Sequence, residues 1–89
     1  MTNEKYIVVA LKSKVDVFSM IDELLLSGVR AETTPNLKET KTGCGIAVKA
    51  PLNSLHTIIG IIEMGGYKSI NGVFLVERQG QRTSRRKIY

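Results

Sequence analysis

The sequence predicts an α+β domain built from two β-α-β units that share one antiparallel sheet. Six segments have either strand-like or helix-like apolar patterns, in the order strand, helix, strand, strand, helix, strand. The two halves also resemble each other, because Gly28-Val29-Arg30 and Gly66-Tyr67-Lys68 each follow the helix of their own half. This order is typical of a ferredoxin-like split β-α-β sandwich (βαββαβ), with both helices on one face of the sheet.

In the first half, the apolar run 6–11 predicts a central strand. Ser13 and Asp16 have the spacing of a helix cap, and an amphipathic helix follows over 15–26. Gly28 can adopt the left-handed conformation that ends a helix. Residues 30–34 alternate between polar and small side chains, which predicts an edge strand.

In the second half, turn formers and charges over 35–43 predict a loop, and 45–50 predicts a second central strand. Leu55, Ile58, Ile59 and Ile62 mark the buried face of a second helix, capped by Asn53 or Ser54 and ended by Gly65-Gly66. Asn71-Gly72 fits either a two-residue hairpin or a bulge in one final strand that ends at Glu77.

Length and composition limit the class of protein. At 89 residues, 43% hydrophobic and 24% charged, the chain fits one small globular domain. No apolar stretch approaches the roughly 20 residues of a spanning helix, and no secretory leader is evident, so we expect a cytoplasmic protein that does not enter a membrane. The single cysteine, Cys44, excludes an intramolecular disulfide, and the chain lacks the second cysteine and the clustered histidines that a zinc site requires.

The net charge of +5 is concentrated at the C-terminus. Residues 1–77 contain as many acidic as basic side chains and are predicted to be the domain, whereas 78–89 is predicted to be a basic, mobile tail. The tail is either a solvated terminus or an arm for an acidic partner or nucleic acid. Nucleic-acid binding is not expected except through Arg82, Arg85 and Arg86. The predicted strands offer little aromatic stacking surface beyond Tyr6, Tyr67 and Phe74.

Candidate chemistry gathers at one end of the predicted sheet. The ferredoxin-like topology brings 43–45, the helix start at 12–14 and the turn at 65–66 together there. Cationic side chains and helix amides would stabilise a Cys44 thiolate. The alternative is that Cys44 begins a buried strand and is inert. The candidate residues are Cys44 as the reactive thiol, with Lys12, Ser13, Lys14, Lys41, Gly43 and Gly45 as anion-holding or access residues.

Other catalytic or cofactor sites are not evident. His56 lies on the polar side of the second helix, which begins at the opposite end of the sheet, so we expect a surface histidine. Asp22 and Glu23 are adjacent on a helix and diverge, unlike paired catalytic carboxylates. No metal site and no cofactor are predicted.

Ser13, the helix over 15–26, Thr34-Pro35 and Cys44-Gly45 followed by an apolar strand together resemble the small bacterial family of selenium/sulfur carrier-like proteins. The resemblance covers residue 6 to about residue 77. It implies that Cys44 accepts sulfur or selenium as a persulfide or selenenylsulfide and passes it between donor and acceptor proteins, rather than acting as an enzyme with turnover. The alternative from another class is a non-catalytic regulatory or interaction module that binds a small ligand or partner, with self-association open.

Overall fold

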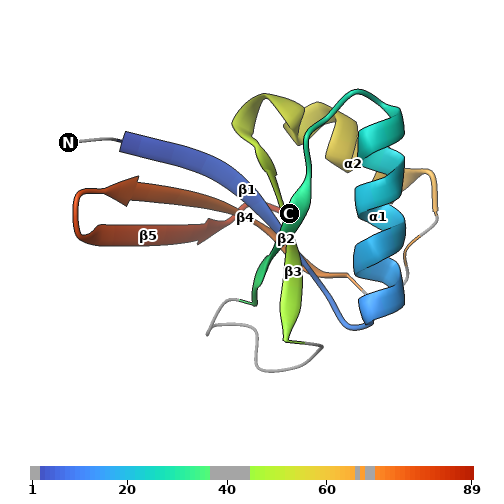
Figure 1. The fold of residues 1–89 in the computed structure, drawn as a ribbon, viewed down its shortest axis with the longest axis horizontal. Helices are drawn as coiled ribbons and strands as arrows, with labels where there is room; N and C mark the ends of the chain where they lie inside the picture. Colours follow the sequence, from blue (N-terminus) through green and yellow to red (C-terminus); the bar gives the residue numbers. More distant parts are fainter. Residues whose placement is uncertain (1–2, 37–44, 66, 68–69) are drawn as a thin grey trace.

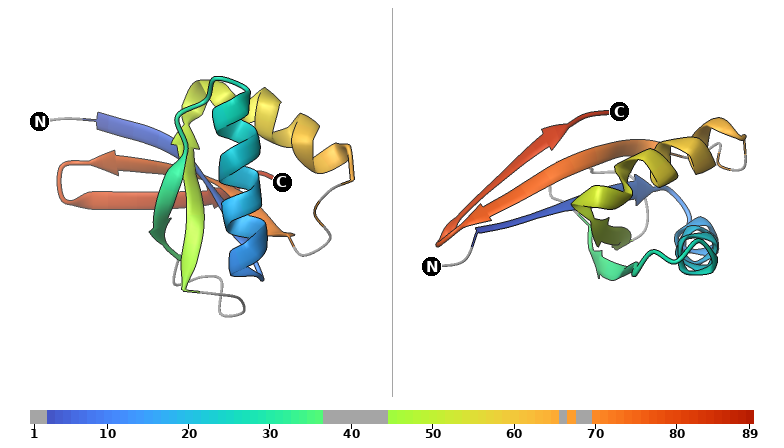
Figure 2. Two further views of the ribbon diagram at one scale, coloured as in Figure 1. Left: turned by 45° about the vertical axis from the view of Figure 1, so that its right-hand side comes forward. Right: turned by 90° about the horizontal axis from the view of Figure 1, so that it is seen from above.

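Five antiparallel strands form one sheet, and two helices pack on one of its faces (Figure 1 and Figure 2). The computed structural model describes residues 3–36, 45–65, 67 and 70–89. The strand order is β2-β3-β1-β4-β5. The elements are β1 (Asn3–Leu11), α1 (Lys14–Leu26), β2 (Glu32–Pro35), β3 (Ile46–Pro51), the 3-10 helix η1 (Leu52–Ser54), α2 (Leu55–Glu63), β4 (Ile70–Gln79) and β5 (Arg82–Lys87).

β1 is the central strand, as its continuous apolar run predicts. It pairs with β3 on one side and β4 on the other, both antiparallel. Residues 7–11 are at most 1% exposed, because the sheet is covered on both faces at this point. A strand buried on both faces needs apolar side chains at consecutive positions, which explains the absence of alternation in its sequence.

α1 begins at the predicted cap. The Ser13 hydroxyl accepts a hydrogen bond from the backbone N–H of Val15 at 3.2 Å. The helix ends at Leu26, and Gly28 follows with φ of +83°, a conformation that favours glycine. The side chains that face the sheet recur at helical spacing and are Val17, Met20, Ile21 and Leu24.

The second helix differs slightly from its prediction. η1 precedes it, and the Ser54 hydroxyl donates to the carbonyl of Pro51 at 2.5 Å instead of capping α2. α2 ends at Glu63, and Gly65 follows with φ of +89°. Ile58 is its fully buried residue.

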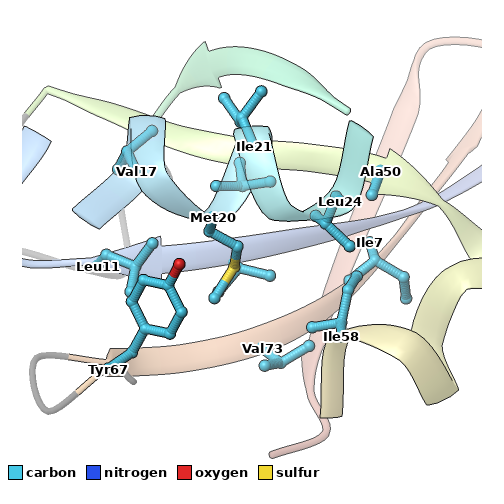
Figure 3. Packing of buried hydrophobic residues seen from close by; sticks show 12 residues of the cluster. Ile7, Leu11, Val17, Met20, Ile21, Leu24, Ala50, Ile58, Tyr67 and Val73 are labelled. Atoms are coloured by element: carbon cyan, nitrogen blue, oxygen red, sulfur yellow. The ribbon is translucent and has the colours of Figure 1, made fainter. Parts of the chain in front are cut away.

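The core lies between the helices and the sheet (Figure 3). Odd-numbered residues of β1 point towards the helices, so Ile7, Val9 and Leu11 pack with Met20 and Leu24. Even-numbered residues of β1 point to the opposite face. There a second buried cluster, to which no described helix contributes, contains Val8, Ala10, Ala47, Phe74 and Val76.

Asn71-Gly72 lies within β4 and forms a bulge, not a hairpin. Gly72 is opposite Ala10 and Ile70 is opposite Leu11, so the register shifts between these two pairs. One extra residue on β4 produces this shift. The strand therefore continues unbroken from Ile70 to Gln79.

The C-terminal segment corrects the expected domain layout. Residues 78–89 are not a tail without regular structure, because β4 extends to Gln79 and β5 pairs with it from Arg82 to Lys87. Gly80, with φ of +61°, lies in the turn between them. The α+β class and the antiparallel sheet with two helices are confirmed. The sheet has five strands, however, and the β4–β5 hairpin projects beyond the helices (Figure 1).

Candidate functional site

Four of the predicted thiol-site residues lie at one end of the sheet. β1 and β3 are antiparallel, with Val9 opposite Val48, so the end of β1 and the start of β3 share that end. Lys12, Ser13 and Lys14 follow β1, and Gly45 precedes β3. Lys12, Lys14 and Gly45 are exposed, and nothing lies within 4 Å of a Cβ placed on Gly45. Cys44, Lys41 and Gly43 lie outside the described residues.

The helix start at this end is less positive than the sequence predicts. Ser13 uses its hydroxyl oxygen to cap α1, which occupies the N–H of Val15. Asp16 lies in the first turn, where a carboxylate offsets the positive end of the helix dipole. Lys12 and Lys14 therefore remain the main source of positive potential at this end.

A second candidate site lies on the sheet face opposite the helices, here called the helix-free face. Antiparallel pairing places side chains of neighbouring strands in rows across this face. Both rows have apolar side chains in the middle and a cation at the β5 end. One row is Glu32, Lys49, Val8, Phe74 and Lys87, and the next is Pro51, Tyr6, Val76 and Arg85.

Tyr6 is the most accessible aromatic side chain of these rows. It is half-buried, whereas Phe74 is only 7% exposed. The Lys49 ammonium lies 4.5 Å from the centroid of the Tyr6 ring, a cation–π contact. A shallow pocket of about 190 Å³ adjoins the ring, and its lining residues are Tyr6, Arg30, Glu32, Lys49, Ala50 and Pro51.

On the β5 side, Lys87 is held against the sheet. A Cβ on Gly72 would be 2.9 Å from the Lys87 Cε atom and 3.1 Å from the Phe74 ring. Glycine at position 72 thus leaves room for the aliphatic stem of Lys87 to cross β4 beside the ring. A lysine stem placed in this way covers apolar surface.

The two faces of β5 differ in their charged neighbours. Arg85 and Lys87 lie on the helix-free face, whereas Arg82 and Arg86 lie on the other face, in register with Gln79 and Leu75. On that other face Glu77 accepts a hydrogen bond from Gln79 Nε2 at 2.8 Å, and it lines a pocket together with both Arg85 and Arg86. Acidic side chains lie on both faces of the sheet: Glu4 and Glu32 on the helix-free face, and Glu77 on the other.

Tyr67 is the described group with a perturbed pKa, and its position favours a structural role. Burial raises the pKa of its phenol, and the Glu23 carboxylate raises it further. The phenol donates to Glu23 Oε1 at 2.7 Å, and Figure 3 shows its oxygen directed towards α1. This bond ties the chain after α2 to α1.

Sequence reasoning missed the helix-free face. Tyr6 and Val8 alternate with Ile7 and Val9, so the sequence contained the signal that Tyr6 lies opposite the core. It contained no comparable signal for β5, whose six residues are all polar or charged. His56, expected at the surface, is exposed.

Comparisons with family models, with curated proteins and with solved structures found no match for this chain. Within the described residues, no helix is long and apolar enough to cross a membrane. Across the same part of the chain, no cluster of three or more His, Cys, Asp or Glu side chains could hold a metal ion. The functional proposals rest on the geometry of the chain itself.

Proposed function

We propose that the chain is a ferredoxin-like domain, extended by a fifth strand, that binds nucleic acid through the helix-free face and β5. One observation carries this proposal: β5 presents four exposed cations and no acid, and pairing with β4 gives each of them a defined face. A disordered basic tail would lose conformational entropy when it binds a phosphate backbone, whereas a paired strand is already ordered.

The spacing of the cations supports a ligand with repeated negative charge. Arg85 and Lys87 are two residues apart in a strand and hence about 7 Å apart on one face. Lys49 lies three strands away in the same row as Lys87, which is about 14 Å across the sheet. A polyanion that crosses the sheet can therefore contact cations on both sides of the apolar centre.

The test measures binding of fluorescein-labelled 12-nucleotide uridine and thymidine oligomers as a function of salt concentration. Three phosphate contacts predict a slope of about −2 for the logarithm of affinity against the logarithm of salt concentration. Raising salt from 50 to 200 mM should then weaken binding by about 20-fold. Binding that does not change with salt would contradict the proposal.

A matched pair of variants tests which face is used. Arg85→Gln/Lys87→Gln and Arg82→Gln/Arg86→Gln remove the same charge from opposite faces of β5. We expect the first pair to lower the salt slope by about 1.4 and the second to change it much less. Equal effects would mean that binding follows net charge alone. Deleting 78–89 is a poorer test, because it removes β5 and the end of β4.

We propose sulfur or selenium transfer at Cys44 as a second candidate function. The observation that favours it is that Lys12 and Lys14 lie at the same sheet end as Gly45, the residue after Cys44. The Cys44 thiolate would attack the terminal sulfur of a donor persulfide, forming a new persulfide as the donor leaves as a thiolate.

The alkylation rate of Cys44 against pH, in native and unfolded protein, tests this second function. Fast native labelling well below the ordinary thiol pKa of about 8.5 would support it. Slow labelling that unfolding restores would contradict it. Cys44→Ser should abolish loading from a persulfide donor and leave the thermal unfolding curve unchanged.

A further inference from the structure

We infer that Tyr6 and its adjoining pocket form a base-stacking subsite, which makes a single strand the preferred nucleic-acid ligand. This inference rests on the proposed nucleic-acid binding. It adds a contact with the bases, which phosphate contacts alone do not recognise. It assigns a base to the half-buried Tyr6 ring and its adjoining pocket, and the phosphates to the cations around them. The apolar centre of this face, where Val8 and Ala10 are at most 1% exposed, is not part of the subsite.

The position of Tyr6 in the sheet carries the inference. Its row places it between Pro51 on β3 and Val76 on β4, with Arg85 one strand further. On the β3 side, Lys49 and Arg30 border the same pocket. A single-stranded nucleic acid that crosses the β-sheet thus meets a cation, an aromatic ring and a second cation in succession.

The pocket has the chemistry of a base site. The ring of Tyr6 offers a π-face that already holds the ammonium group of Lys49 at 4.5 Å. A base can take that face while Lys49, on its flexible stem, moves to the adjacent phosphate. Arg30 and Glu32, which also line the pocket, supply a donor and an acceptor for the edge of a base.

Duplex bases are stacked on one another, so their faces cannot lie against the Tyr6 ring. Unstacked bases of a single strand can lie on aromatic side chains, and every base has a face for this contact. The structure therefore predicts that the protein distinguishes single strands from duplexes of equal charge. It also predicts little preference between uridine and thymidine oligomers, because stacking does not read the sugar.

The experiment compares a 12-nucleotide thymidine oligomer with an abasic oligomer of the same length and backbone. Wild-type protein should bind the thymidine oligomer about 5- to 150-fold more tightly. Tyr6→Leu keeps an apolar side chain in the sheet and should remove most of this difference. Tyr6→Phe keeps the aromatic face and should preserve it. Circular dichroism and thermal melting check that both variants are folded.

A second measurement does not depend on any variant. An oligomer containing 5-iodouridine, irradiated on the wild-type protein, should crosslink to Tyr6, which peptide mass spectrometry identifies. Crosslinks only to residues outside the helix-free face would overturn the inference.

The outcomes separate this inference from the proposed function. If abasic and thymidine oligomers bind equally and Arg85→Gln/Lys87→Gln weakens both, stacking at Tyr6 is wrong and phosphate binding stands. If neither oligomer binds in a salt-dependent way, the proposed function itself fails. A uridine oligomer that binds much more tightly than thymidine would show that the sugar is read, which contradicts stacking as the main contact.

Discussion

Replacing Tyr67 with phenylalanine tests whether a single hydrogen bond fastens the chain after α2 to α1. The Tyr67 phenol donates to Glu23 Oε1 at 2.7 Å, and Tyr67 as a residue is 9% exposed. Phenylalanine keeps the ring and its packing among the helix-side core residues. The variant therefore removes the hydrogen bond and little else.

The expected loss of stability follows from the type of bond. Hydrogen bonds to charged groups contribute about 1.5–3 kcal/mol, but Glu23 is exposed and water competes for its carboxylate. We expect Tyr67→Phe to lower the free energy of unfolding by about 1 kcal/mol. For a domain of this size that corresponds to a fall in Tm of about 4–8 °C, which thermal melting followed by circular dichroism measures.

The pH dependence provides a second signature of the same bond. Burial and the facing Glu23 raise the pKa of the Tyr67 phenol, and Asp16 and Asp22 act in the same direction. An unfolded tyrosine begins to ionise near pH 10, so the unfolded state loses its proton first. The stabilisation is therefore complete below pH 10 and is lost as the pH rises further, at up to about 1.4 kcal/mol per pH unit.

A double-mutant cycle supplies the control. Glu23→Gln removes the charged acceptor, and Tyr67→Phe should cost less in that background than in the wild type. The reasoning is refuted if Tyr67→Phe leaves the Tm unchanged at neutral pH. It is also refuted if the difference between variant and wild type is the same above pH 10 as at neutral pH.

Three further changes test the packing and capping described above. Leu24→Ala should destabilise the domain by about 2–5 kcal/mol because Leu24 is fully buried, whereas Leu26→Ala should cost little because Leu26 is 89% exposed; equal losses in urea denaturation would contradict the assigned helix face. Ser13→Ala should cost about 1 kcal/mol through loss of the α1 cap, and Ser13→Asp should retain most of that stability. Gly72→Ala should reduce stability and shift the NMR signals of the Lys87 Hε protons, since its Cβ would meet Lys87 and Phe74; unchanged signals would refute that contact.

The elements that bury apolar side chains could be predicted from the sequence. The continuous apolar run 6–11 identifies the buried central strand. The helical spacing from Val17 to Leu24 identifies the face of α1 that packs in the core. The bulge at Asn71-Gly72 remained one of two alternatives, because the same dipeptide suits a hairpin. The partner strand decides between the two, because β1 pairs with β4 on both sides of Asn71 and β4 therefore does not turn back there.

β5 could not be predicted from its own sequence. Its sequence, Arg-Thr-Ser-Arg-Arg-Lys, has no apolar position that reports a buried face. Its strand conformation comes from backbone pairing with β4, and charged residues are typical of an edge strand that must not pair further. Arg85 joins the row of Tyr6 only through this pairing, so the extent of the helix-free face could not be predicted either.

The predicted thiol site is a different case. The antiparallel pairing of β1 and β3 follows from the predicted topology, and it places Lys12, Ser13, Lys14 and Gly45 at one end. Ser13 serves as a cap there, which the spacing to Asp16 also predicts. Cys44, Lys41 and Gly43 lie outside the described residues, so their part in that site stays a prediction.

The most direct test of the central claim is an NMR titration of the full chain with the 12-nucleotide uridine oligomer. Shifts should concentrate in side chains and amides of the helix-free face, above all Tyr6, Lys49, Arg85 and Lys87. α1 should change little, because it lies on the opposite face of the sheet. Shifts centred on α1 or on Lys12–Lys14, or none at all at low salt, would contradict the claim that the helix-free face is the binding surface.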